Sequence, residues 1–246
     1  MKKLYVVSTA IVLAAMSFGS TQVQAQNPLK GGMQYIGPGA GFYVLPIASL
    51  NSQIRYSGFA NGFESNVMYI GLERGRFNHV NASSTEFNSA TLLTFHYLMP
   101  QTITDSSREM TLGGWNMQYD GSSFDFISSR KVVFTAGLGW QWGRTKIVSN
   151  DGTGETVYTN PYFIPMVRSE LSFTLFDRVT LGARAAYRHD WSKTGWRKKS
   201  GNGADLPGTR LSGGMYGAFI AFTFGSADQE EAPAEVMPAP SAPGAE

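Results

Sequence analysis

The deciding stretch of the chain is Tyr216-Gly217-Ala218-Phe219-Ile220-Ala221-Phe222-Thr223-Phe224. Its alternate positions, from Tyr216 through Ile220 and Phe222 to Phe224, are all apolar. This period of two predicts a β-strand with one apolar face. An apolar strand that ends on an aromatic residue is typical of the closing strand of a membrane β-barrel, where the apolar face contacts lipid. We therefore interpret the other strands with lipid as the outer solvent.

The N-terminal end of the chain predicts export. Lys2 and Lys3 precede an apolar run from Leu4 to Phe18, and small and polar residues lead to Ala25. This pattern predicts a signal peptide over residues 1–25. The run is shorter than the roughly 20 apolar residues of a membrane-spanning helix. The chain contains no Cys, which excludes disulfides, thiolate catalysis and a lipoprotein anchor.

Composition separates the C-terminal end from the domain before it. Residues 226–246 hold five acidic residues, four prolines and no base, so we predict a disordered, acidic, Ala/Pro-rich tail. Residues 26–225 suit a single all-β domain. Without Lys2 and Lys3, 18 basic residues balance 18 acidic ones. A neutral mature chain gives no support to nucleic-acid binding.

The clearest hairpin surrounds Phe176-Asp177-Arg178, with apolar and polar residues alternating on both arms. If these three residues form the turn, Glu170 lies opposite Arg184 on the polar face. Opposite charges across a strand pair support this register, since a one-residue slip would move both into the apolar face. In a barrel the polar face points into the lumen. We expect a lumen network of paired charges formed by Arg168, Glu170, Arg184 and Arg188.

Two features favour a membrane barrel over a soluble β-sandwich. Aromatic residues gather at or near predicted strand ends, as an interfacial girdle requires: Tyr97, Trp115, Trp140, Trp142, Tyr187 and Trp191. Small residues occupy the opposite face, where a narrow barrel has little room: Gly137, Gly139, Gly182, Ala186 and Gly217.

The fold expected is an antiparallel transmembrane up-and-down β-barrel of about eight strands, with ten as the alternative. Strands are predicted at 32–44, 63–77, 86–99, 111–127, 131–147, 162–176, 178–190 and 210–225. The first is interrupted by Gly37-Pro38-Gly39. Connections at 128–130 and 176–178 are tight, whereas 148–161 and 191–209 are predicted to be long loops. Long loops belong outside the cell, which leaves the tail in the periplasm.

Together, the signal peptide, the short-turn hairpins and the aromatic-terminated last strand resemble small bacterial outer-membrane barrels of the OmpA/OmpX/OmpW type. The segments Glu231-Ala232-Pro233-Ala234-Glu235 and Pro238-Ala239-Pro240 are similar to the linker that follows the barrel in OmpA-type proteins. There a peptidoglycan-binding domain follows, and here the chain stops at Glu246. Gln26, directly after the predicted cleavage site, is a feature common in exported proteins of Bacteroidetes-like bacteria.

Catalytic and metal chemistry have weak signals. His189-Asp190-Trp191-Ser192 is the one place where a His, an acid and a Ser are adjacent, but neighbours in a strand point to opposite faces. The segment does not match the patterns of lipid A deacylase or palmitoyltransferase barrels. Asp151-Gly152-Thr153-Gly154-Glu155 lacks the acid spacing of a calcium loop and is interpreted as a hairpin tip. We expect no catalytic residue, metal site or cofactor.

A basic loop is predicted on the outer side of the barrel. It combines Lys193, Arg197, Lys198 and Lys199 with Trp191 and Trp196. Lysine, arginine and interfacial tryptophan suit the phosphates of lipopolysaccharide. The alternative is a solvated charged loop without a ligand.

The function expected is that of a non-catalytic integral protein in the outer membrane of a Gram-negative bacterium. It would stabilise the envelope or act as an accessory subunit of a membrane assembly, with a protein partner bound through the tail or the outer loops. The alternatives are a narrow pore or transporter for small solutes, a lipid A-modifying enzyme and a soluble secreted sandwich.

Overall fold

The computed structural model describes residues 32–78, 92–128, 132–176, 178–191, 195–203 and 205–224. The predicted signal peptide and acidic tail lie outside these residues. The described elements, in chain order, are β1 (Gly32–Val44), α2 (Ala48–Tyr56), β2 (Asn66–Asn78), β3 (Leu92–Asp105), β4 (Arg108–Ser128), β5 (Val132–Asn150), β6 (Glu155–Leu175), β7 (Val179–Arg188), β8 (Arg197–Ser200) and β9 (Gly213–Phe224).

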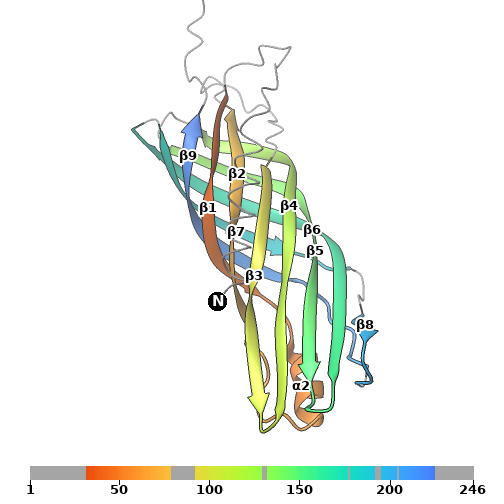
Figure 1. Ribbon diagram of the computed structural model, residues 1–246. Helices are drawn as coiled ribbons and strands as arrows, with labels where there is room; N and C mark the ends of the chain where they lie inside the picture. The colour runs from red at the N-terminus through yellow and green to blue at the C-terminus, as the bar shows by residue number, and fades with distance from the viewer. Residues whose placement is uncertain are drawn as a thin grey trace, which may run out of the picture.

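All strand pairs are antiparallel, and they close into a barrel (Figure 1). The order runs from β1 through β6 to β7 and β9, and β9 pairs with β1. This leaves eight strands in the described wall, with the short β8 added along the edge of β6. The predicted fold class and the count of eight are confirmed.

The two ends of the barrel differ. At the end where β1 begins and β9 finishes, here called the terminal end, β6 and β7 are joined by a tight turn. At the opposite end, here called the helix end, α2 lies beside the ends of β3, β4, β5 and β6 (Figure 1). Among the described residues, no helix has the length and apolar character needed to cross a membrane.

Several predicted boundaries are wrong, and most errors lie at the helix end. Residues 148–161 were expected to form a long loop, but β5 and β6 continue through them and leave only 151–154 as the connection. The expected loop 191–209 contains β8, and α2 was not predicted. Gly37-Pro38-Gly39 does not end β1, which pairs with β2 along its whole length, although its pairing with β9 skips Gly37 and Pro38 and resumes at Gly39.

Burial alternates along the strands and separates an outer face from an inner one. In β5, Leu138 and Trp140 are exposed on the outside, 62% and 42% respectively, whereas Gln141 is fully buried inside. In β7 the buried positions are polar or small, and the exposed ones are apolar or alanine. Apolar residues outside and polar ones inside are the arrangement of a membrane-spanning barrel.

The polarity of the two faces reverses toward the helix end. On the outer face of β5, Trp142 is followed by Arg144 and Lys146, both exposed, while the inner face turns from Gln141 to the fully buried Ile147. We call residues 45–65, 99–113, 144–161, 195–203 and 205–212 the cap, and the remaining described wall the barrel segment. The aromatic residues Trp115 and Trp140 lie at the junction of the two parts. They therefore lie within β4 and β5, whereas the sequence analysis placed them at or near the ends of shorter predicted strands.

Candidate functional site in the barrel interior and on the cap

The barrel segment has a cluster of charges centred on Glu170. This residue lies directly opposite Arg184, which confirms the register predicted for the hairpin. Arg184 donates to Glu170 Oε2 through Nε at 2.9 Å and Nη2 at 2.6 Å, and Arg168 Nη1 donates to the same oxygen at 3.2 Å. Tyr35 and Ser172 donate to the other carboxylate oxygen at 2.6 and 3.1 Å. The buried carboxylate is thereby fully engaged.

Arg184 connects this cluster to a second carboxylate. Its Nη1 forms an ion pair with Glu73, which lies on β2 across the lumen. The other oxygen of Glu73 lies 2.8 Å from His96 Nε2. All three side chains are buried. A guanidinium shared between two carboxylates links β2, β6 and β7 and stabilises the interior by charge-assisted hydrogen bonds.

A layer of uncharged polar groups around Tyr43 continues the network toward the helix end. The Tyr43 hydroxyl lies 2.7 Å from His96 Nδ1 and accepts hydrogen bonds from Gln118 and Gln141 at 2.6 and 2.8 Å. It donates to Asn116 Oδ1 at 3.0 Å. Hydrogen bonds thus connect side chains of β1, β3, β4 and β5 across the lumen.

Arg188 departs from the predicted lumen network. It is buried and points inward, as expected, but no salt bridge to a carboxylate is found for it among the described residues. It donates to Gln141 Oε1 at 2.7 Å and its guanidinium lies over the Tyr43 ring, 4.6 Å from the centroid. Of the four predicted lumen residues, three therefore form the charge cluster and Arg188 lies outside it.

Glycine residues leave the space that these large side chains occupy. A Cβ at Gly39 would lie 2.7 Å from Glu73, and one at Gly71 would lie 2.4 Å from the His96 ring. A Cβ at Gly182 would lie 2.2 Å from the ring of Phe219, which stacks on Tyr35. Of these three glycines, Gly182 was predicted from the sequence as a small inward residue, and Gly39 and Gly71 were not.

The cap closes the helix end with an apolar core. Leu50 and Ile54 of α2 are almost completely buried. They belong to one hydrophobic cluster with residues from the surrounding strands and loops: Leu45, Ile47, Phe59, Phe63, Leu98, Met110, Leu112, Ile147, Tyr158 and Trp196. Tyr43 also belongs to this cluster, so the apolar core begins where the polar network ends.

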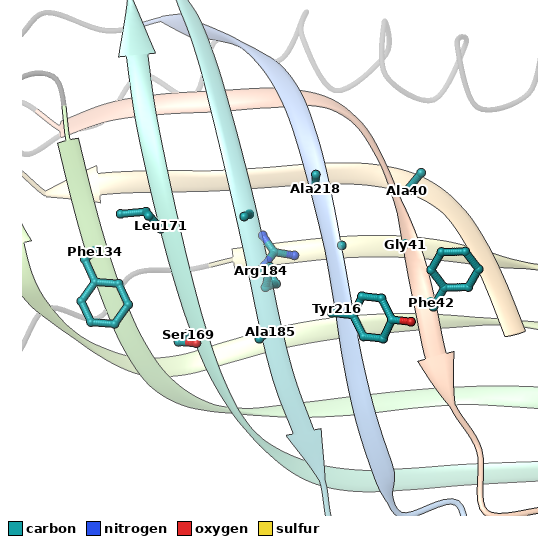
Figure 2. A pocket seen from close by; sticks show the side chains of 12 residues that line it. Ala40, Gly41, Phe42, Phe134, Ser169, Leu171, Arg184, Ala185, Tyr216 and Ala218 are labelled. Carbon is teal, nitrogen blue, oxygen red and sulfur yellow. The ribbon is translucent and has the colours of Figure 1, made fainter. Parts of the chain in front are cut away.

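The outer face of the barrel segment is apolar over the length that a membrane strand requires. In β9 it runs from Tyr216 through Ile220 and Phe222 to Phe224, and all four are exposed. This is about the nine to eleven residues of a tilted membrane strand. A shallow groove of about 480 Å³ lies in this wall. Figure 2 shows its lining, in which Ala218 and Ala185 lie among larger neighbours such as Tyr216 and Phe134.

Basic side chains cover part of the outer face of the cap. Thr159 of β6 pairs with Lys146 of β5 on one side and with Arg197 of β8 on the other. Lys146 and Arg197 are both exposed, as are Arg144 and Lys199. Lys198 is also exposed and lies 3.4 Å from Asp205. Lys193 of the predicted loop lies outside the described residues.

The two tryptophans of the predicted basic loop have different environments. Trp191 is 74% exposed, as an interfacial residue would be. Trp196 is only 8% exposed, packs in the cap core and donates its indole N–H to Thr209 at 3.2 Å. The expectation that Trp196 contacts lipopolysaccharide is therefore wrong. Its ring stabilises the cap from within.

The weaker sequence motifs form local structure. His189 is exposed beside Tyr187 and Trp191, whereas Asp190 is buried and accepts a hydrogen bond from Leu211 N at 2.9 Å. The two side chains diverge, as predicted.

Asp151 Oδ1 accepts hydrogen bonds from the Thr153 hydroxyl and from the backbone N–H groups of Thr153 and Gly154. These bonds, led by that of the hydroxyl, lower the pKa of Asp151. Residues 151–154 thus form a hairpin tip whose carboxylate is already engaged.

Sequence analysis missed part of the interior. Glu73, His96 and Tyr43 were not recognised, although each lies at a buried position of a strand with alternating burial. The signal that was present is the pairing of large polar residues with nearby glycines, as in Gly71-Leu72-Glu73. A local sequence pattern could not identify the partners of these residues, because Glu73 and Arg184 are far apart in the chain.

The closed antiparallel wall, the apolar outer band and the polar interior define the chain as a β-barrel of the membrane-spanning type. No protein-family model matches the sequence, and no curated protein matches it. Among solved structures, the chain is similar to Ail, the attachment invasion locus protein of Yersinia pestis, in a complex with the heparin analogue sucrose octasulfate. The identity is 12% and the TM-score is 0.46, and the match covers 80% of this chain and 100% of that chain.

Proposed function

We propose that this protein is a non-catalytic integral outer-membrane β-barrel whose closed cap is displayed at the cell surface for interaction with other envelope components. The observation that carries the proposal is that side chains fill the interior from the charge cluster at Glu170 to the cap core at Leu50. A barrel of about eight strands has an interior just wide enough for side chains. Such a molecule would act through the surfaces it presents, because side chains fill the part of the interior that the structure describes.

A narrow pore is the alternative, and the polar lumen is the feature that favours it. The charges in that lumen are engaged by one another, and α2 with its neighbours covers the helix end. The test is single-channel recording of the purified protein in planar bilayers. The proposal expects no steady conductance, and Leu50→Asp is expected to introduce intermittent opening by disrupting the cap. Steady conductance of the unaltered protein would overturn the proposal in favour of the pore.

We further propose that the cap contacts lipopolysaccharide phosphates. The exposed bases Arg144, Lys146, Arg197 and Lys199 lie just beyond the junction where Trp140 is exposed, which is the level of lipid headgroups when the helix end faces outward. Lysine and arginine bind phosphate through charge-assisted hydrogen bonds. The groups form part of a strand-paired surface, since β8 is held against β6.

Charge reversal tests this contact. The double substitution Arg197→Glu and Lys199→Glu should reduce binding of fluorescent lipopolysaccharide by roughly tenfold or more, because two attractive contacts become repulsive. Arg74→Glu combined with Arg178→Glu is the matched control, because it makes the same change of four charges at two residues that are exposed toward the terminal end. Equal loss in both variants would show that only net charge matters and would refute a site on the cap.

A protein partner remains part of the proposal. Its contacts would be made by the cap or by residues 226–246. A mild-detergent pull-down from outer membranes, with full-length protein and a variant lacking residues 226–246, distinguishes the two. A stoichiometric partner lost with the tail would make the protein an assembly subunit. Purification of the protein alone in both cases would exclude that role.

A further inference from the structure

Two bases flank one threonine on the outer face of the cap. Lys146 of β5 and Arg197 of β8 pair with Thr159 of β6 from its two sides. Residues directly opposite one another in a sheet point to the same face, so these three side chains share one face. Tyr158 and Asn160, the chain neighbours of Thr159, are buried on the inner face, which places Thr159 on the outer one. We call Lys146, Thr159 and Arg197 the basic row.

The basic row has the spacing for one anion between its two bases. Lys146 and Arg197 are exposed, whereas Thr159 points outward but is only 6% exposed, so neighbouring side chains cover it. Adjacent strands lie about 4.8 Å apart, which sets the Cα atoms of the two bases roughly 10 Å apart. Lysine and arginine side chains are long enough to meet over Thr159 from this separation. A phosphate that lies between them can accept hydrogen bonds from both.

The charge of the basic row is not balanced by a neighbouring acid. In the described part of the chain, neither base of the row forms an ion pair. On β5 and β6 the nearest acid is Glu155, four residues from Thr159 and therefore about 13 Å along the strand. Asp205 lies against Lys198, which pairs with the inward-facing Tyr158 and so lies off the row. The surface at the basic row therefore attracts anions.

A phosphate monoester matches the two charges of the basic row. It carries a charge of about −1.5 to −2 at neutral pH and three acceptor oxygens. A phosphodiester carries a single negative charge and is the poorer match. Mg²⁺ binds oxygen ligands and is commonly held through phosphate groups. The two bases and Mg²⁺ would therefore compete for the same oxygens.

We propose that Lys146 and Arg197 bind one phosphate monoester of lipopolysaccharide above Thr159, and that they do so in place of Mg²⁺. This assignment rests on the proposed contact between the cap and lipopolysaccharide, and it narrows that contact to one site and one competing ion. The two bases supply the positive charge that a divalent cation supplies elsewhere in the lipopolysaccharide layer. Added Mg²⁺ therefore weakens binding to the protein, and chelation of Mg²⁺ strengthens it.

The test is binding of fluorescent lipopolysaccharide to the purified protein in detergent, titrated with Mg²⁺ at constant ionic strength. Lys146→Gln combined with Arg197→Gln should weaken binding by roughly tenfold or more, because two charge-assisted hydrogen bonds are lost. Arg144→Gln combined with Lys199→Gln is the matched control. It removes the same charge from exposed residues of the same surface that do not pair with Thr159, and it should retain most of the binding. Equal losses in the two double variants would overturn the proposal, because net charge alone would then set the affinity.

A second measurement changes the ligand and leaves the protein unaltered. Lipopolysaccharide from which a phosphatase has removed the phosphate monoesters should bind roughly tenfold more weakly than the untreated form. Equal affinity for the two forms, or binding that Mg²⁺ does not weaken, would overturn the phosphate site while leaving a contact between the cap and lipopolysaccharide in place. If the unaltered protein bound neither form, the proposed contact itself would be refuted, and the phosphate site with it.

Discussion

The barrel segment and the cap are built by the same strands but have opposite distributions of polarity. Along the outer face of β5, Leu138 and Trp140 are followed by Arg144 and Lys146, while the inner face changes from Gln141 to Ile147. The barrel segment is surrounded by lipid and the cap by water. The outer face must therefore be apolar in the barrel segment, and the inner face must be apolar in the cap. The position of this reversal locates the membrane boundary without reference to any other protein.

Different interactions stabilise the barrel segment and the cap. In the barrel segment lipid is as apolar as the residues that face it, so the interior depends on hydrogen bonds and ion pairs such as Glu170–Arg184. In the cap, burial of Leu50 and Ile54 removes apolar surface from water. Substitutions of the same kind should therefore have different effects in the two parts.

The largest effect is expected for a reversal of charge in the lumen. Glu170→Lys removes the acceptor of Tyr35, Arg168 and Arg184 and places like charges together, and we expect a loss of about 3–5 kcal/mol or failure to fold. Glu170→Gln keeps the shape and should cost about 1–3 kcal/mol. The measurement is urea unfolding in lipid vesicles, monitored by tryptophan fluorescence.

Glu155→Lys is the matched control, because Glu155 is exposed at the cap end of the same strand. It should change the free energy of unfolding by less than about 0.5 kcal/mol. Equal stability of Glu170→Lys and Glu170→Gln would refute the pairing with Arg184.

Truncation of leucine tests the apolar core of the cap. Leu50→Ala should leave a cavity and reduce the free energy of unfolding by about 2–5 kcal/mol. Leu138→Ala removes the same atoms from the outer face of the barrel segment, where lipid fills the space, and should cost much less. Similar losses for the two variants would show that both sites face the same kind of environment.

Insertion of a charge tests where the outer solvent changes. Leu138→Lys places an ammonium group in the apolar band and should cost about 2–4 kcal/mol. Val148→Lys lies on the same face of the same strand, beyond Lys146, and should cost less than about 0.5 kcal/mol. The ratio of folded to unfolded protein in vesicles measures both. A large penalty at Val148 would move the membrane boundary toward the helix end.

The reversal also explains which parts of the fold the sequence could predict. The hairpin from Val167 to Tyr187 lies within the barrel segment, and its alternation and charge pairing were enough to predict its register. Residues 148–161 were interpreted as a loop, but they extend β5 and β6 into the cap, beyond the point where Arg144 and Lys146 replace the apolar outer face. Trp196 was assigned to the surface for a related reason, since a tryptophan among lysines suggests an interface. Its burial depends on the cap core to which α2 contributes Leu50 and Ile54, and no local pattern indicated that helix.

The smallest effect is expected where a glycine makes room in the lumen. Gly182→Ala places a Cβ 2.2 Å from the far end of the Phe219 ring, and that ring cannot move freely because it stacks on Tyr35 at 5.0 Å. We expect a cost of about 1–3 kcal/mol in the urea unfolding assay.

Gly154→Ala is the control, since a Cβ at that hairpin tip meets no atom within 4 Å. Phe219→Leu combined with Gly182→Ala should recover part of the loss, because the smaller side chain relieves the collision. If the double variant were as unstable as the sum of the single ones, overpacking would not be the cause, and the requirement for glycine at 182 would lie in the backbone of β7.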